Sequence, residues 1–173
     1  DDASATARHK EMRWVSRLTR AADEDKLQLV FQPIVPIGSQ SDAHPHYELL
    51  LRLTDEAGGI VYPGEFIPAA ERYNVMPALD RWVVERALSC WVPSRRNGFR
   101  SSPFTVAVNL SGTTLSDQGF LEYLIERLEA HDPVPGALCF EITETAAIAN
   151  LANVGFFMRE LRTRGCLVAL DDF

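Results

Sequence analysis

Short apolar segments that alternate with helical patterns place the strongest constraint on the fold of this 173-residue chain. Three such segments span residues 104–110, 138–142 and 166–170, and amphipathic helical patterns fill the sequence between them. Strands that are apolar along their whole length are typical of parallel sheets, which are buried on both faces. The second half of the chain is therefore predicted to be an α/β unit, a parallel sheet covered by helices.

Two further strands are expected in the first half, at residues 27–35 and 47–53. The polar loop of residues 38–46 returns the chain, so these two strands are expected to pair antiparallel. Pro33 lies within the first of them and has no amide hydrogen to donate, which indicates an edge strand or a strand end.

Helical periodicity is expected in five places, and the residues before the first helix are small and polar, as in a frayed end. Ser116 and Asn150 are interpreted as N-caps of the last two helices. The expected helical ranges are residues 8–25, 65–72, 78–92, a segment from Ser116 and a segment from Asn150. We take residues 1–25 as an N-terminal helical linker and residues 26–173 as the domain.

Composition excludes several classes of function. The formal net charge of −7 argues against a nucleic-acid polymer as partner, because such surfaces need a basic stripe. No apolar run approaches the roughly 20 residues that cross a membrane. Cys90, Cys139 and Cys166 are widely spaced among apolar neighbours, which favours buried reduced thiols and a cytoplasmic location.

Charged and amide side chains interrupt the apolar strands. Glu48 and Arg52 lie on one face of the strand at residues 47–53, because side chains alternate along a strand. A buried charge costs free energy unless a partner or a metal compensates it, and an isolated Glu-Arg pair is usually structural. The same oddity recurs downstream, because Asn109, Glu141 and Asp171 each end a separate apolar strand.

Strand ends of a barrel or an open parallel sheet converge on one face, where active sites form. Four carboxylates, those of Glu48, Glu141, Asp171 and Asp172, together with the Asn109 amide, would supply oxygen ligands there. Such ligands suit Mg²⁺ or Mn²⁺ better than zinc, and all four histidines are placed in a helix or in loops. Two metals, with Asp171 bridging them, would activate a water for attack on a phosphodiester, and Arg52 would hold a phosphate oxygen.

These residues together resemble the EAL family of bacterial cyclic-di-GMP phosphodiesterases. No strand precedes a Gly-x-Gly-x-x-Gly or Gly-Lys-Ser/Thr motif, so nucleotide-binding sheets of those types are disfavoured. The resemblance runs from about Leu27 to the last residue. It rests on the following stretches: Phe31-Gln32-Pro33-Ile34-Val35, Glu48-Leu49-Leu50-Leu51-Arg52, residues 63–71, Asn109-Leu110-Ser111, Glu141-Ile142-Thr143-Glu144 and Leu170-Asp171-Asp172-Phe173.

The resemblance implies a modified (β/α)8 TIM barrel with an antiparallel first strand, and hydrolysis of cyclic di-GMP to linear pGpG with magnesium or manganese. By position, one metal would take Glu48, Asn109, Glu141 and Asp171, and the second would take Asp171 and Asp172. Gln32, Leu50 and Arg52 resemble substrate contacts, and Glu144 resembles the residue that anchors the loop after the double aspartate. The resemblance also implies a homodimer and a GGDEF or sensor domain before the helical linker.

The sequence departs from the family pattern in three places. Leu49 replaces the signature alanine, a packing change beside a ligand, and the loop between Gln32 and Glu48 is longer than usual. The family continues after Asp-Asp-Phe with further strands that carry a lysine and glutamates. About the first five strands are therefore expected here, and this chain alone is expected to be unable to turn over substrate.

Two alternatives to the enzyme remain open. The first is a catalytically silent receptor for cyclic di-GMP, against which the retained set of candidate metal ligands argues. The second is an unrelated metal-dependent barrel enzyme of the enolase type, which would need lysine bases and does not predict the Gln32-Pro33 or Glu48–Arg52 stretches.

Overall fold

A computed structural model describes residues 2–37, 44–149 and 151–171 of the chain. The described residues form one sheet with the strand order β1-β2-β4-β5-β6, and a short strand, β3, pairs with β2. The strands are β1 (Leu27–Ile34), β2 (His46–Thr54), β3 (Ile60–Val61), β4 (Thr105–Leu110), β5 (Leu138–Thr143) and β6 (Leu167–Asp171).

The pairing confirms the direction expected of each strand. β1 runs antiparallel to β2, and β2, β4, β5 and β6 are mutually parallel. β1 forms one edge of the sheet, which accommodates Pro33 near its end, because an edge strand needs no amide donor on its outer side.

β3 is the element that the five expected strands omit. Its two residues follow a tight turn in which the Asp55 carboxylate accepts hydrogen bonds from the amides of Ala57 and Gly59. Gly58 completes the turn with a φ of 84°, a conformation that glycine adopts without a steric penalty. β3 is thus a product of the turn, and two residues are too few to produce an alternating pattern.

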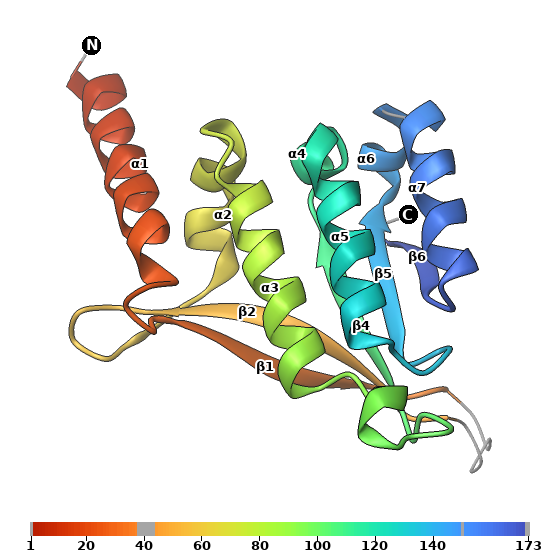
Figure 1. Cartoon of the computed structure of the whole chain (residues 1–173). Helices are drawn as coiled ribbons and strands as arrows, with labels where there is room; N and C mark the ends of the chain where they lie inside the picture. Colours follow the sequence, from red (N-terminus) through yellow and green to blue (C-terminus); the bar gives the residue numbers. More distant parts are fainter. Residues whose placement is uncertain (1, 38–43, 150, 172–173) are drawn as a thin grey trace.

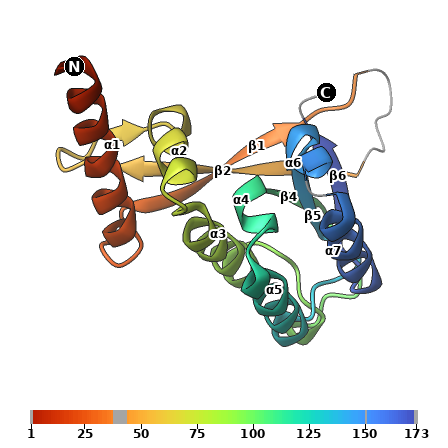
Figure 2. The ribbon, with the colours of Figure 1, turned by 90° about the horizontal axis from the view of Figure 1, so that it is seen from above.

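The helices line one side of the sheet (Figures 1 and 2). Figure 1 shows α3, α5 and α7 side by side along the strands, with α1 standing at the end of the row beside α2. The helices are α1 (Asp2–Ala21), α2 (Pro63–Arg72), α3 (Met76–Cys90), α4 (Gly112–Leu115), α5 (Gln118–His131), α6 (Glu144–Ala149) and α7 (Leu151–Thr163), with a 3-10 turn at Arg95–Asn97.

Two apolar clusters hold the helices to the sheet. The larger joins β4 and β5 to α3, α5 and α7, with Phe120 and Phe140 fully buried at its centre. The smaller joins α1 and α2 to the start of β1, at Leu27, and the end of β2, at Leu53. In this cluster Trp14 packs on Phe66, with the ring centroids 6.3 Å apart. Trp14 is 9% exposed, so the indole that lies off the expected helical stripe packs within this chain.

Four sequence expectations are corrected by the structure. α1 begins at Asp2, so the expected frayed end is helical. Ser116 does not cap α5, because a separate short helix, α4, precedes it and Asp117 accepts the capping hydrogen bond from Gly119. Cys90 is exposed, although the other two cysteines are buried and all three are free. His46 begins β2 and so does not lie in a loop. The expected Asn150 cap lies outside the described residues.

The two faces of the sheet differ in chemistry. Side chains alternate between faces, so Leu49, Val108, Phe140 and Leu138 point to the helices and are buried. The opposite face is the one that carries Glu48, and it lies away from the helical layer (Figure 2).

Candidate functional site

Four of the residues singled out by sequence share the face away from the helices. Asn109 and Glu141 are register partners on β4 and β5, and Asp171 on β6 pairs with Thr143, two residues beyond Glu141. Glu48 on β2 is the register partner of Ala107, two residues before Asn109. A spacing of two residues keeps a side chain on the same face, so three carboxylates and one amide come from four adjacent strands.

Asn109 and Glu48 are in direct contact. Asn109 Nδ2 donates a hydrogen bond of 2.6 Å to Glu48 Oε1. Asn109 is exposed and Glu48 is half-buried, so both side chains remain accessible from the open face of the sheet. The contact orients one carboxylate oxygen of Glu48 toward the end of β4.

The carboxylate of Glu141 responds to its surroundings. Burial, and after it the negative charges of Glu48 and Asp171, raise the pKa of Glu141 from its ordinary value of 4.5 to about 7. Like charges disfavour ionisation of a neighbour, and the contributions of Glu48 and Asp171 to this shift reflect their proximity to Glu141.

The donor set fits a hard divalent cation. The candidate ligands Glu48, Asn109, Glu141 and Asp171 offer only oxygen donors if the Asn109 amide turns its oxygen inward, and a cation would relieve the repulsion that raises the Glu141 pKa. Within residues 2–37, 44–149 and 151–171, no three Asp, Glu, His or Cys side chains are already assembled around one metal position. Asp172, expected to ligate the second metal, lies outside the described residues.

The expected substrate contacts adjoin this cluster. Gln32 on β1 is the register partner of Glu48 and is exposed on the same face. Arg52 lies further along β2, where its guanidinium stands 5.0 Å from the centroid of the Tyr62 ring and its Nη1 donates to the Leu51 carbonyl. No contact between Arg52 and Glu48 is present among the described residues, so the two do not form the structural ion pair considered from sequence.

A cavity of about 420 Å³ opens at the carboxyl end of β4, next to Asn109. Leu50 lines it, together with Ile67 from α2 and Thr143 from β5. Most of its lining side chains are apolar and a few are polar, which is the usual character of a small-molecule site.

Asp80 is the residue at this cavity that the sequence analysis missed. It lies on α3, is only 4% exposed, and accepts a 3.0 Å hydrogen bond from the Ser111 amide. Burial raises its pKa, while the hydroxyl of Thr114 and the Ser111 amide act in the opposite direction. The signal available in the sequence was an acidic residue on the apolar face of the helix at residues 78–92.

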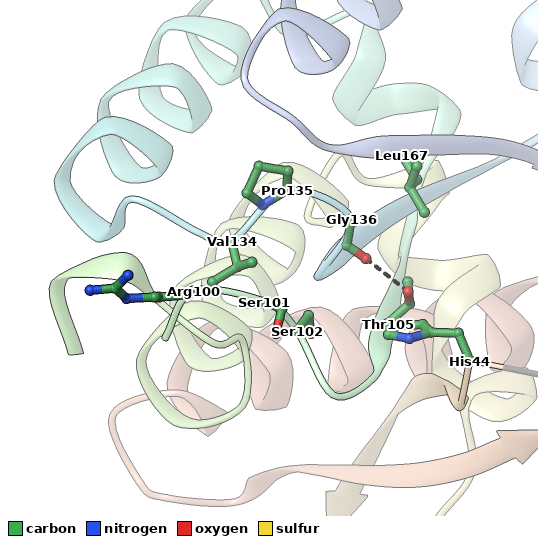
Figure 3. A pocket seen from close by; sticks show the side chains of 9 residues that line it. All are labelled: His44, Arg100, Ser101, Ser102, Thr105, Val134, Pro135, Gly136 and Leu167. Carbon is green, nitrogen blue, oxygen red and sulfur yellow. Dashed lines mark hydrogen bonds between the residues drawn. The ribbon is translucent and has the colours of Figure 1, made fainter. Parts of the chain in front are cut away.

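A second cavity, of about 450 Å³, lies at the opposite ends of the strands (Figure 3). Thr105 and Leu167 begin β4 and β6, and the Thr105 hydroxyl donates to the Gly136 carbonyl that precedes β5. Arg100 extends away from the cavity in Figure 3, and no carboxylate is among the described residues that line it. This larger cavity therefore takes no part in the cluster around Glu141.

Comparison with known sequences decides the family. The model of the EAL domain family matches residues 15–173, which is most of the chain. The chain belongs to the EAL domain family. The match begins inside α1 and includes every strand of the sheet.

Several relatives of this EAL domain chain have names. The chain is 35% identical over 172 residues to cyclic di-GMP phosphodiesterase PdeB of Shewanella oneidensis, covering 99% of the chain and 20% of the relative. It is 31% identical over 152 residues to cyclic di-GMP phosphodiesterase PA2567 of Pseudomonas aeruginosa, covering 87% of the chain and 25% of that protein. The EAL domain chain thus spans about a fifth to a quarter of these relatives.

Solved structures agree in fold. The EAL domain of FimX from Pseudomonas aeruginosa, bound to c-di-GMP, superposes with a TM-score of 0.78 at 29% identity, covering 92% of this chain and 62% of that one. The c-di-GMP complex of the PaMucR phosphodiesterase superposes with a TM-score of 0.76 at 26% identity, covering 93% of this chain and 64% of that one.

The variant signature of this EAL domain is explained by the two faces of β2. Leu49, in place of the alanine of the EAL signature, is 3% exposed and belongs to the larger apolar cluster. Its neighbours Glu48 and Leu50 point to the other face.

Glu144 follows β5 directly as the first residue of α6 and is exposed. None of the described helices is both long and apolar enough to cross a membrane.

Proposed function

We propose that this chain is part of a phosphodiesterase domain that hydrolyses cyclic di-GMP to linear pGpG with Mg²⁺ or Mn²⁺. The observation that supports the proposal most directly is the convergence of Glu48, Asn109, Glu141 and Asp171 on one open face of the sheet. Membership of the EAL domain family and the names of PdeB and PA2567 add the substrate class.

Each residue has a proposed role. Glu48, Asn109, Glu141 and Asp171 would hold one metal, and Asp171 and Asp172 would hold a second. The metals, when bound, supply an activated water and stabilise the leaving oxygen of the phosphodiester. Gln32, Leu50 and Arg52 would hold the cyclic dinucleotide, with the Arg52 guanidinium paired to a phosphate oxygen.

The proposal concerns a domain larger than this chain, since the chain spans 62% of the solved FimX EAL domain. We propose that turnover needs groups beyond Phe173, so the isolated chain is inactive. We also propose that Glu144 anchors the loop that follows the double aspartate. Residues 1–25 are proposed to connect residues 26–173 to a preceding GGDEF or sensor domain, in a cytoplasmic protein that pairs with a second copy.

The test is an assay of the full-length protein and of the isolated chain with cyclic di-GMP, in which chromatography measures pGpG. The full-length protein is expected to form pGpG, to lose activity in EDTA, and to recover it with added Mn²⁺. Glu48→Gln is expected to abolish turnover, whereas Glu126→Gln, which alters an exposed carboxylate on α5, serves as the matched control. Turnover that survives EDTA, or that is unchanged by Glu48→Gln, would contradict the proposal.

A receptor for cyclic di-GMP is the second candidate. One observation favours it: the solved EAL domain of FimX, 29% identical to this chain, is bound to c-di-GMP. Isothermal titration of the full-length protein distinguishes the two functions. A receptor binds cyclic di-GMP equally well with and without metal and forms no pGpG.

A further inference from the structure

Helix α3 contacts the carboxyl end of β4 through one buried acid. Asp80 is 4% exposed, although it is a charged residue, and the apolar residues Leu79 and Val83 lie beside it on the same helix. Buried carboxylates are uncommon unless their oxygens are hydrogen-bonded. The hydrogen-bond partners of Asp80 therefore indicate which segment of the chain its carboxylate holds in place.

The hydrogen-bond partners of Asp80 in the described part of the chain are Ser111, which follows β4, and Thr114 in α4. The Ser111 amide donates to Asp80 Oδ2 at 3.0 Å, and the Thr114 hydroxyl also donates to the carboxylate. Ser111 in turn caps α4, because its hydroxyl oxygen accepts a hydrogen bond from the Thr114 amide. The network therefore ties α3, the end of β4 and the start of α4 into one unit.

The position of Ser111 explains why an acid is used here. β4 pairs with β2 as far as Val108 and with β5 as far as Leu110, so the next amide has passed the end of the ladder. The ladder offers this amide no acceptor, and the Asp80 carboxylate supplies one. The direction of the chain immediately after Asn109 is thus set by a side chain from another element.

We propose that Asp80 is a positioning residue that directs the Asn109 amide toward Glu48. Only Leu110 separates Asn109 from the anchored Ser111, so the backbone at Asn109 is held on one side by the ladder with β5 and on the other by Asp80. Asp80 does not need to touch the substrate, because its oxygens are occupied within the turn. This inference rests on the proposed function where it concerns turnover.

The first test is a double-mutant cycle in the full-length protein. Asp80→Ala is expected to lower kcat on the order of 10-fold or more, the size seen when the support of a metal ligand is lost. In the Asn109→Ala background the same change is expected to alter kcat less than about 2-fold, because the group that Asp80 directs is gone. Asp80→Asn is expected to retain most activity, since the amide oxygen still accepts from Ser111.

The second test needs no turnover. In proton–nitrogen correlation spectra of this chain, the Asn109 side-chain amide, assigned by its loss in Asn109→Ala, is expected to exchange slowly because it donates to Glu48. Asp80→Ala is expected to speed that exchange, and Asp80→Asn is not. Where Asp80→Ala yields no folded protein, Thr114→Val removes a donor to the carboxylate at nearly constant volume and is expected to act in the same direction.

Asp117→Ala is the matched control. Asp117 also caps a helix and accepts a 2.7 Å hydrogen bond from Arg81, the neighbour of Asp80, but it lies outside the Asn109 network. It is expected to lower stability without changing kcat or Asn109 exchange. Equal kcat losses from Asp80→Ala in both backgrounds, or a rise in KM alone, would overturn the inference. A wild-type protein that forms no pGpG would overturn the proposed function instead, and the exchange experiment would still decide the role of Asp80.

Discussion

Asn109 Nδ2 lies 2.6 Å from Glu48 Oε1, although 61 residues separate the two in sequence. The contact joins β2 to β4, two parallel neighbours whose register pairs on this face are His46 with Thr105 and Glu48 with Ala107. It joins the first residue of the EAL signature to the asparagine one residue before the end of β4, and it is the one direct bond between candidate ligands in the described part of the chain.

This contact predicts how Asn109→Asp will behave. A carboxylate at this position removes the donor and places a second negative charge against Glu48, so the two side chains are expected to repel each other and separate. Turnover of cyclic di-GMP at pH 7 is expected to fall on the order of 10²-fold or more, as when one electrostatic group of an active site is removed. Steady-state kinetics check this, and Asn153→Asp, at an exposed position on α7, is the control. Activity near wild type in Asn109→Asp would contradict it.

The raised pKa of Glu141, about 7, predicts the pH dependence of stability. Because the folded state binds this proton more tightly than the unfolded state does, the favourable contribution is complete below the ordinary pKa of 4.5. It is lost as the pH rises through about 7. Without metal, denaturant titrations are expected to show this part of the stability decreasing from pH 5 to pH 8.

Removing a neighbouring charge tests the cause of that shift. Glu48→Gln is expected to lower the pKa of Glu141, because the Glu48 charge is one of the causes of its elevation. Carbon-detected NMR titration of the Glu141 carboxyl measures it. An unchanged pKa would mean that burial alone is responsible, since burial is the largest cause.

Leu49→Ala restores the residue of the family signature, and its effects on stability and activity are expected to separate. Leu49 is buried in the apolar cluster, so its truncation is expected to cost about 2–5 kcal/mol of unfolding free energy. Turnover per folded molecule is expected to stay near wild type, because the side chain points away from Glu48. Urea unfolding and active-site titration check the two halves, and a large loss of kcat would contradict the second.

The packing of Trp14 on Phe66 predicts that α1 contributes to the stability of the fold. Trp14→Ala removes the packing on Phe66 and the ring that lies beneath Arg17, so a loss of about 3–5 kcal/mol is expected. Met12→Ala, at a position 53% exposed on the same helix, is expected to change stability little. Equal effects of the two changes, measured by urea unfolding, would mean that α1 does not pack on α2 in solution.

The positive φ of Gly165, two residues before β6, predicts that this position requires glycine. Its φ of 79°, with Pro135 atoms 3.2 Å from where a Cβ would stand, means that Gly165→Ala combines strain with a clash. A loss of about 1–3 kcal/mol is expected from the strain alone. Gly155→Ala, inside α7 with only the Arg159 side chain near, is expected to raise stability by about 0.5–1 kcal/mol. Thermal melts compare the two, and a stabilising Gly165→Ala would contradict the assigned geometry.

Local pattern was enough to predict most elements. The apolar runs that end at Asn109, Glu141 and Asp171 form β4, β5 and β6. The barrel-like fold was predicted from the family resemblance. The element boundaries that were wrong have physical causes. The cap of α5 moved from Ser116 to Asp117, because the chain first makes the short helix α4, and both residues are equally good caps by type.

The sequence by itself determined which residues face the site, because strand alternation places Glu48 and Arg52 on one face and Leu49 on the other. It did not determine their partners. Arg52 lies over Tyr62 and not against Glu48, and the buried acid Asp80 holds the turn after β4. Such contacts depend on which helices and strands pack together, and periodicity within one segment carries no information about side chains from another. Only the tertiary structure brings Asn109 to Glu48 and raises the pKa of Glu141, because both effects act through distances across separate strands.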